Sequence, residues 1–316
     1  MAGGQERVLR RRIKSVQSTR KITKAMELIA ASRIAKAQAR IKAASPYSEE
    51  LTRALAAVLQ DDSLRHPMLT GVDERRRTGI VLITSDRGLA GGYNANAIRT
   101  ANQLASRLEG DGREVVRYII GRKGATYYNF RRIELAGTWT GFSEQPSFSD
   151  IRDLTEQLEI ALSATSENDT EDVKGLDELY IVYTKFKNSV SQVPVAEQLS
   201  PVKDATDITD AEEGDDSEDA DTHEQVSYEF EPEPDELIAS LLPRYISARI
   251  FSALLESAAS ESAARRRAMK SASDNAEELI RTYTRLANQA RQAEITQEIS
   301  EIVGGADALA SAGSDE

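Results

Sequence analysis

The stretch AASRIAKAQARIKAASPYSEELTRALAAV, residues 30–58, decides the fold of the N-terminal part of the chain. Its apolar residues recur every three or four positions, the spacing of one face of an α-helix. They are Ala30, Ile34, Ala37, Ile41, Ala44, Leu51, Leu55 and Val58. From about residue 5 to residue 58 the sequence has no Gly, and Pro46 is its one helix breaker. This pattern predicts a long N-terminal helix over residues 1–60.

We call the line of apolar residues along the helix its seam. Continued towards the N-terminus in the same register, this seam is predicted to drift around the helix. It lands on the polar residues Arg20, Thr23 and Glu27 before it reaches apolar residues again at Leu9, Ile13 and Val16. In the polar interval, the apolar residues sit one position earlier, at Ile22, Met26 and Ile29. Such a drift is expected where the partner of a helix wraps around it or changes along its length.

The C-terminal part also predicts one long helix, over 235–305, with a break at Pro243 and a flexible tail at 306–316. Its apolar and small residues alternate in steps of three and four, the heptad repeat of a coiled coil. They are Met269, Ala272, Ala276, Leu279, Tyr283, Leu286, Ala290 and Ala293. The two helices would span on the order of 80 and 100 Å. Since a middle domain of ordinary size could not cover them, we expect the helices to pair and project from it.

Residues 77–203 carry the pattern of an α/β domain, in which short apolar runs alternate with helical stretches. The expected strands are 79–85, 114–120, 132–139 and 178–184, the expected helices are 94–109, 123–130 and about 151–162, and 184–199 resembles a hairpin. The predicted fold class is therefore α/β plus a long coiled coil. Two long terminal helices form an antiparallel coiled coil around a central Rossmann-like α/β domain.

The formal net charge of −12 is unevenly distributed. Residues 7–26 contain eight Arg and Lys and no acid, whereas Asp204 to Glu236 contains sixteen Asp and Glu and no base. A block of like charge with few apolar residues does not offset the entropy of ordering it. The sequence therefore predicts an acidic, disordered insertion at 204–224 within a linker 204–234, and a shorter polar loop at 163–175.

The sequence offers little for catalysis. Without Cys, the chain has no disulfide, zinc–thiolate or thiol chemistry. Its two His, His66 and His223, lie in a loop-like stretch and in the acidic tract. The segment SDRGLAGGYN, residues 85–94, lies between a strand and a helix, but its glycines fit neither common phosphate-binding spacing. We expect a tight turn there, and no catalytic residue, metal or cofactor in the chain.

The basic N-terminal stretch, residues 7–26, admits other interpretations. A basic region followed by heptads is typical of DNA-binding zippers, so a nucleic-acid-binding or scaffold coiled coil is the alternative function. Against it, the basic residues continue along the heptads, at Arg33, Lys36, Arg40 and Lys42, and no aromatic residue precedes Tyr47. No window approaches the apolar length of a membrane span. A mostly polar helix of this length instead suits a shaft inside a polar or acidic partner.

Four segments resemble the γ subunit of F-type ATP synthase. They are ITKAMELIAASRIAKAQ (22–38), TSDRGLAGGYN (84–94), ASESAARRRAMKSASDNA (259–276) and ARQAEITQEISEIVGGA (290–306). The resemblance implies a non-catalytic rotor subunit, the central stalk. Its coiled coil would lie inside a ring of three α and three β subunits, with the α/β domain near ε and the c ring. Proton flow through the c ring would turn the shaft and drive ATP synthesis in β. It also implies no nucleic-acid partner and only indirect membrane contact, through the c ring.

The resemblance also assigns residues and a location. Those expected to contact the α/β ring are Met26, Arg265, Arg291, Gln292 and Thr296. The basic shaft face, expected opposite carboxylates of β, consists of Arg10, Arg11, Lys14, Arg20, Lys21 and Lys24. The turn of the α/β domain carries Asp86, Gly88, Gly91 and Gly92. Because the chain has no Cys, the dithiol control of chloroplast members is excluded. We therefore expect a bacterial protein, peripheral on the cytoplasmic side of the plasma membrane.

Overall fold

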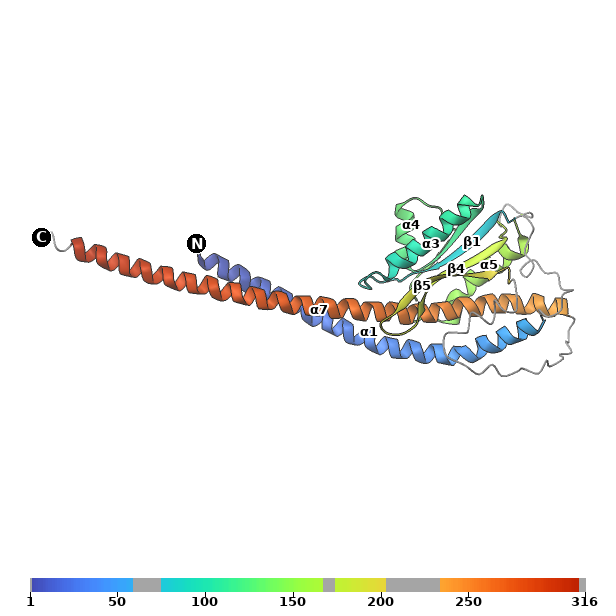
Figure 1. Cartoon of the computed structure of the whole chain (residues 1–316), viewed down its shortest axis with the longest axis horizontal. Helices are drawn as coiled ribbons and strands as arrows, with labels where there is room; N and C mark the ends of the chain where they lie inside the picture. The colour runs from blue at the N-terminus through green and yellow to red at the C-terminus, as the bar shows by residue number, and fades with distance from the viewer. Residues whose placement is uncertain (1, 59–74, 167–173, 203–233, 313–316) are drawn as a thin grey trace. The chain divides into compact units, whose positions relative to one another are not determined.

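The computed structural model of the chain describes residues 2–58, 75–166, 174–202 and 234–312 (Figure 1). The acidic tract 204–224, residues 167–173 of the polar loop and both His lie outside the described residues. The chain divides into two compact units. The sheet unit comprises residues 30–265, and the coil unit comprises residues 1–29 together with 266–316.

A five-stranded sheet forms the centre of the sheet unit. Its strands are β1 (Arg77–Ile83), β2 (Glu114–Ile120), β3 (Gly137–Trp139), β4 (Glu178–Phe186) and β5 (Gln192–Ser200), in the spatial order β3-β2-β1-β4-β5. The first four strands are parallel, and β5 returns antiparallel to β4 as a hairpin. In the register of the central strand, Val81 faces Tyr118 on β2 and Ile181 on β4. The parallel α/β core and the terminal hairpin are confirmed.

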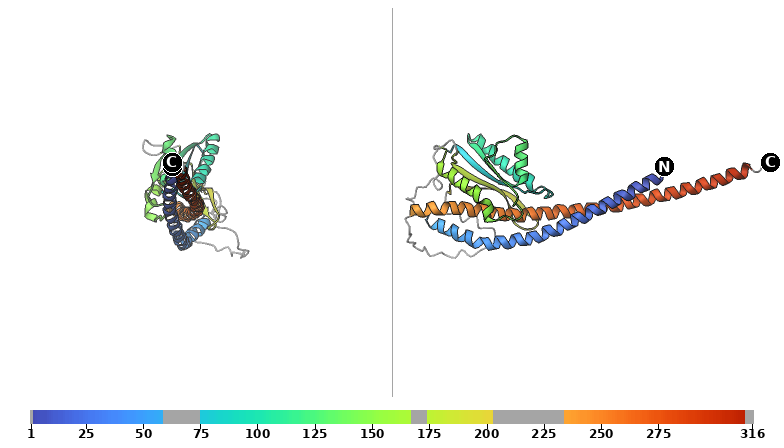
Figure 2. Two further views of the ribbon diagram at one scale, coloured as in Figure 1. Left: turned by 90° about the vertical axis from the view of Figure 1, so that its left-hand side faces the viewer. Right: turned by 180° about the vertical axis from the view of Figure 1, so that it is seen from behind.

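Two apolar layers cover the sheet (Figure 1). On one face, α3 (Tyr93–Gly110) and α4 (Arg122–Phe130) pack on Ile80, Leu82 and Ile119. On the other, η1 (Phe148–Ile151) and α5 (Arg152–Ala164) share a core with residues 51–58 and 238–254 of the two long helices. Because both faces are covered, β1 is buried along almost its whole length, as central parallel strands usually are. Figure 2 shows the same layers from behind.

The third strand is shorter than the predicted 132–139. It begins only at Gly137, because Arg132 adopts a φ of 56° and the chain turns there after α4. At the start of α4, Gly121 has a φ of 95°, and a Cβ at this position would lie 2.1 Å from the carbonyl oxygen of Thr84. A glycine is therefore required where β2 passes into α4 beside the end of β1.

The two long helices are α1 (Ala2–Val58) and α7 (Pro234–Ala312). The predicted break at Pro243 is wrong, since α7 continues through it, and α1 likewise continues through Pro46. A proline inside a helix removes one hydrogen bond, but Leu242, Tyr245 and Ile246 around Pro243 are buried in the core, which offsets that loss. At its other end, α7 continues to Ala312, where the sequence predicted a flexible tail from residue 306.

One stretch of α7, within Leu237–Gly304, is long and apolar enough to cross a membrane by length and composition. This corrects the expectation that no window approaches a membrane span. The stretch is 44% buried inside the protein. Core helices of water-soluble proteins can have the same length and composition. Residues such as Ile250 and Leu254 are apolar there because they pack into the core of the sheet unit.

In the coil unit, α1 and α7 run antiparallel (Figure 2). The Thr23 and Ser273 hydroxyls share a buried hydrogen bond of 2.7 Å, and Arg20 lies 3.6 Å from Glu277. The predicted drift of the seam is wrong here. Thr23 faces α7, whereas the apolar Ile22 and Ile29 are 59% and 53% exposed. A Thr–Ser pair is small and satisfies both hydroxyls, so the seam continues straight through the polar interval.

The predicted heptad seam of α7 is right at its start and shifted further along. Met269 and Ala276 are buried as expected, but Leu279 and Leu286 are 44% and 37% exposed. The buried position of the later turn is Ala287, one residue beyond Leu286. Small side chains allow two helix backbones to approach closely, so the structure buries the alanine and leaves the leucine at the edge.

Candidate functional site: the turn after β1 and its arginine–glutamate cluster

The turn 85–92 leaves the carboxyl end of β1 and leads into α3. Asn94 in the first turn of α3 folds back onto it, since its Oδ1 accepts from the backbone N–H of Ser85 at 2.9 Å. Gly91 has a φ of 56°, a left-handed conformation that glycine adopts at no steric cost. Leu89, with a φ of 63°, is 62% exposed at the tip of the turn. The expected tight turn is present.

Asp86 fixes this turn to the neighbouring loop after β3. Its carboxylate accepts hydrogen bonds from the backbone N–H groups of Gly141, Ser143 and Arg122 at 2.8, 3.0 and 3.1 Å. In return, the N–H of Asp86 donates to Ser143 Oγ at 2.9 Å. A carboxylate that accepts several backbone N–H groups makes strong, directional bonds. The ends of β1, β2 and β3 are therefore held together by one side chain.

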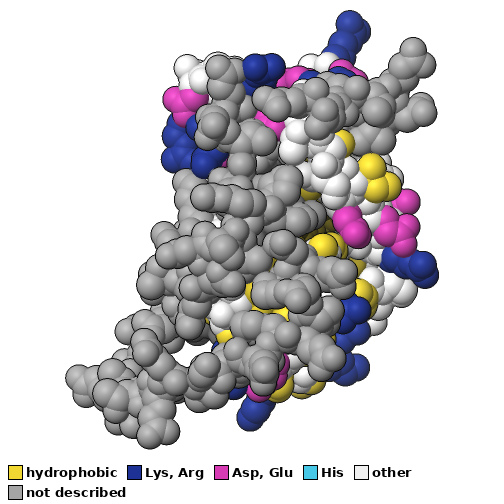
Figure 3. All heavy atoms as spheres, turned by 90° about the vertical axis from the view of Figure 1, so that its right-hand side faces the viewer, with side chains coloured by type: hydrophobic (Ala, Val, Ile, Leu, Met, Phe, Trp, Pro, Cys, Tyr) yellow, Lys and Arg dark blue, Asp and Glu magenta, His cyan; other side chains and the backbone are white. Residues whose placement is uncertain are grey.

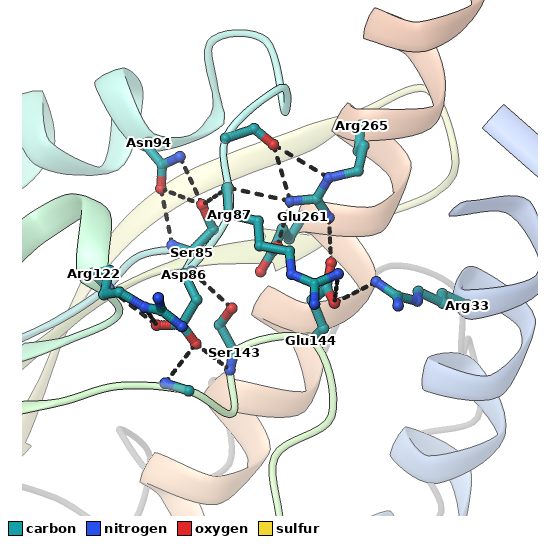
Figure 4. Close-up of polar contacts among 12 residues, drawn as sticks. Arg33, Ser85, Asp86, Arg87, Asn94, Arg122, Ser143, Glu144, Glu261 and Arg265 are labelled. Carbon is teal, nitrogen blue, oxygen red and sulfur yellow. Dashed lines mark hydrogen bonds and ion pairs between the residues drawn. The ribbon is translucent and has the colours of Figure 1, made fainter. Parts of the chain in front are cut away.

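Arg265 of α7 reaches the same turn. Its guanidinium donates to the carbonyl oxygens of Arg87 at 3.2 Å and Gly88 at 3.3 Å, and to Glu261, one helical turn earlier, at 2.7 Å. Only 5% of Arg265 is exposed. A planar guanidinium suits this task, because it can serve several acceptors at fixed angles. Figure 4 shows the side chain extending from α7 to the turn.

Glu144, in the loop after β3, pairs with three arginines from three elements (Figure 4). Its carboxylate lies 3.1 Å from Arg265 on α7, 3.5 Å from Arg87 in the turn, and in an ion pair with Arg33 on α1. The Arg87 side chain is 70% exposed, whereas those of Glu144 and Arg265 are largely covered. Partly buried ion pairs are screened less by salt than exposed ones. We call Glu144, Arg33, Arg87 and Arg265 the arginine–glutamate cluster.

Burial sets the proton affinity of two groups beside this cluster. Burial raises the pKa of the Glu261 carboxyl, and the adjacent Arg265 guanidinium partly opposes that rise. Burial also raises the pKa of the Tyr93 hydroxyl, and the nearby Glu261 charge adds to the effect. Both shifts come from holding polar groups out of water. Among the described residues, no group of three or more His, Asp or Glu could hold a metal ion.

A second polar cluster lies at the other end of the parallel strands, where they begin. The Asp177 carboxylate accepts from the backbone N–H groups of Arg76, Arg77 and Ser166, each at 2.8 Å. Burial alone would raise the pKa of Asp177, but these hydrogen bonds outweigh it and leave the pKa lowered. The fully buried Glu178 pairs with Arg75 and Arg113, each at 2.5 Å. These contacts join the starts of β1, β2 and β4.

The residues predicted to meet a surrounding ring lie in different settings. Arg291, Gln292 and Thr296 are exposed on α7, and Met26 on α1 is half-buried. Arg265 is instead buried in hydrogen bonds within the chain. At about 100° per residue, Arg10, Lys14, Lys21 and Lys24 share one exposed sector of α1, with Arg11 and Arg20 on its flanks. Some are paired locally, as Arg10 is with Glu6 and Lys24 with Glu27.

Sequence reasoning did not find the role of Glu144. The residue lies in GFSEQPSFSD (141–150), a stretch with no recognisable motif. Its three arginine partners are Arg33, Arg87 and Arg265, which are separated along the chain by more than fifty residues each. No local spacing signals such a convergence.

Comparison with known proteins places this fold. The chain matches the family model described as ATP synthase over residues 5–309. The ATP synthase gamma chain of Salinispora tropica is 53% identical, over 98% of this chain and 99% of its own length. That of Streptomyces avermitilis is 50% identical, over 99% of both chains. The chain belongs to the ATP synthase gamma-chain family. The resemblance seen in the four sequence segments is thereby confirmed.

Solved structures show the family's fold. A chain of the Tetrahymena thermophila mitochondrial ATP synthase central stalk and c-ring is similar with a TM-score of 0.55 and 24% identity, covering 80% of this chain and 99% of that one. A chain of the Euglena gracilis mitochondrial ATP synthase OSCP/F1/c-ring assembly, in rotational state 3, gives a TM-score of 0.63 and 16% identity, covering 97% and 95%. Long paired terminal helices around a mixed five-stranded sheet are thus the common architecture.

Proposed function

We propose that this chain is the rotating central shaft of a bacterial ATP synthase. In this proposal, three α and three β subunits surround the coil unit, and the sheet unit meets the ε subunit and the c ring. Proton flow through the c ring turns the shaft, and its changing face drives ATP synthesis in the β subunits. The observation that carries the proposal is the identity of about half of all residues, end to end, with bacterial ATP synthase gamma chains.

The surface of the coil unit supports a surrounding partner. Ile22 and Ile29 on α1 are more than half exposed, as are Ile299 and Ile302 on α7. Repeated exposed apolar side chains on a narrow helix pair are typical of an interaction surface. The exposed cations Arg10, Lys14, Lys21 and Lys24 would face acidic segments of such a partner. The helix pair would thus present both apolar and basic contacts to one ring.

The described residues suggest which side chains make direct contacts. Arg291, Gln292 and Thr296 have exposed side chains on one part of α7 and are available to the α and β subunits. Met26 is half-buried and would contribute part of its surface. Arg265 is too buried for extensive direct contact and would act through the turn that it holds, whose tip residue Leu89 is exposed. In this proposal the chain is not itself catalytic.

The location follows from the same proposal. The relatives quoted above are bacterial proteins, and a bacterial ATP synthase couples to the plasma membrane. We infer that the chain is peripheral on the cytoplasmic side of that membrane and reaches it only through the c ring. No cofactor is assigned to the chain.

The rival function is that of a basic coiled coil bound to nucleic acid. Non-specific binding to phosphates needs a surface dominated by cations. On the end of the sheet unit that Figure 3 shows, the described Lys and Arg side chains are interspersed with Asp and Glu side chains. The net charge of the chain is −12. The negative net charge favours a protein partner over nucleic acid.

Affinity purification of the tagged full chain from its host, followed by mass spectrometry, tests the proposal. We expect the α, β and ε subunits to be recovered in stoichiometric amounts and to resist nuclease treatment. In the purified complex, Gln292→Ala should impair rotation-coupled turnover while assembly persists. Thr284→Ala, at an exposed position on the same helix, is the matched control. Recovery of nucleic acid without α and β would refute the proposal.

A further inference from the structure

The arginine–glutamate cluster lies where both long helices enter and leave the sheet unit. That unit begins at Ala30 on α1 and ends at Arg265 on α7. Arg33, close to the first boundary, and Arg265, at the second, pair with the same Glu144 carboxylate. Glu144 is itself in the loop that Asp86 bonds to the turn after β1. The Glu144 side chain therefore joins both helices to the loops at the carboxyl ends of the strands.

A second set of contacts ties α7 to the backbone of β4. The pairing of β1 with β4 extends to Val182, so Thr184 lies beyond it. There the Ser260 hydroxyl donates to the Thr184 carbonyl oxygen at 2.9 Å, and Ser257 Oγ accepts from the Thr184 N–H at 3.3 Å. The Glu256 carboxylate accepts from the N–H of Phe186 at 3.1 Å. Side chains of α7 thus occupy backbone groups that a further strand would otherwise satisfy.

These bonds differ in kind from the apolar core beneath them. Apolar burial is non-directional, so it does less than a polar contact to fix the exact rotation of a helix against a sheet. Hydrogen bonds to fixed carbonyl and N–H groups, and ion pairs to a shared carboxylate, are directional and resist a change in that rotation. Because Arg265 and Ser260 are almost fully buried, water does not readily replace their partners.

We propose that Glu144, with Arg33, Arg265, Ser257 and Ser260, is a torsional clamp that locks both helices to the sheet against twisting. The inference rests on the proposed rotor function, since only a rotor carries torque through this junction. The clamp residues are positioning residues: they fix the exposed turn 85–92 and the helices as one body. Without the clamp, the helices would twist against the sheet under load, and part of each rotational step would be lost as internal strain.

The test uses the whole ATP synthase in vesicles, with Glu144→Gln as the main variant. This change keeps the shape of the side chain and removes the charge that three arginines share. We expect ATP synthesis against a proton gradient to fall at least about threefold, well within what displacement far from the chemistry can cost. Unloaded ATP hydrolysis, which needs little torque, should stay near the wild-type rate. Arg152→Gln is the control, because it breaks an ion pair in the same unit whose Arg152 side chain is 79% exposed.

A second variant guards against misfolding. Ser260→Ala removes only the hydroxyl that donates to the Thr184 carbonyl oxygen, and it should lower ATP synthesis more than unloaded hydrolysis, to a smaller extent than Glu144→Gln does. Hydrogen exchange in the assembled complex provides a local measure, and opening at Thr184 and Phe186 should become at least about tenfold more frequent in Glu144→Gln. Equal loss of synthesis and hydrolysis, no change in either, or failure of both variants to assemble would overturn the clamp. Failure of the wild-type chain to assemble would instead overturn the proposed function.

Discussion

The sheet unit and the coil unit use the same two helices in opposite ways. In the sheet unit, Leu242, Ile250 and Leu254 of α7 are fully buried against the sheet. In the coil unit, the buried positions are mostly small or polar, such as Thr23, Ser273 and Ala287, and large apolar residues lie exposed. The first unit has a core of its own, whereas the second buries little apolar surface within the chain.

This difference teaches where the stability of each part comes from. Free energy from apolar burial scales with the area removed from water, so the sheet unit holds its helix segments by itself. A narrow pair of helices with a seam of Thr, Ser and Ala removes little area and depends more on helix propensity and on partners. We therefore expect mutations of similar size to act very differently in the two units.

The largest contrast should come from two leucine truncations on the same helix. Leu254→Ala, in the sheet unit, removes a fully buried side chain and should lower the free energy of unfolding by about 2–5 kcal/mol. Leu286→Ala, in the coil unit, truncates a side chain that is 37% exposed and should cost less than about 1 kcal/mol. Urea unfolding of the two variants, followed by circular dichroism, measures both values. Equal losses would mean that the coil seam is a core in its own right.

The next contrast compares an aspartate of the sheet unit, Asp177, with an exposed aspartate of the coil unit, and its outcome depends on pH. Asp177→Asn removes the charge that three backbone N–H groups stabilise and replaces one of the two accepting oxygens by an NH2 donor, so it should cost about 1–3 kcal/mol at pH 7. The pKa of Asp177 is lowered on folding, so the wild-type advantage is present above the unfolded pKa. It is lost as the pH falls through the folded value, below the ordinary 3.8.

Unfolding measured at pH 7 and at successively lower pH tests this prediction. The control is Asp274→Asn, an exposed aspartate on the coil part of α7, which should be nearly neutral throughout. If the cost of Asp177→Asn stays constant down to pH 2, the carboxylate charge is not what the three N–H groups stabilise.

The smallest effect should come from the hydroxyl pair of the coil unit. Thr23→Val keeps the volume of the side chain but leaves Ser273 without its 2.7 Å partner, at a cost of about 1 kcal/mol. A double-mutant cycle with Ser273→Ala should show that the two losses are not additive. Thr19→Val, whose hydroxyl bonds to its own helix at an exposed site, is the control. Additive losses in urea unfolding would show that the two hydroxyls do not interact in solution.

Local patterns were enough to predict most elements. The strands 79–85, 114–120 and 178–184 and the helices between them were predicted to within a few residues, because each segment has its own periodicity and is bounded by Gly or polar residues. The exceptions were β3 and the helix at Pro243. There the outcome depended on a turn at Arg132 and on burial of the residues around the proline, and neither can be read from the local pattern.

The sequence by itself determined that two long helices flank a parallel α/β domain, and through four specific segments it indicated the family. Periodicity and motif strings are properties of neighbouring residues, so they survive without knowledge of the fold. Tertiary structure alone decided which side of each helix is buried in the coil unit, where Thr23 and Ala287 face inward and Ile22 and Leu286 do not. It also decided that Glu144 meets Arg33, Arg87 and Arg265. These choices depend on how closely two backbones approach and on which distant charges converge, and chain folding brings those groups together from separate parts of the sequence.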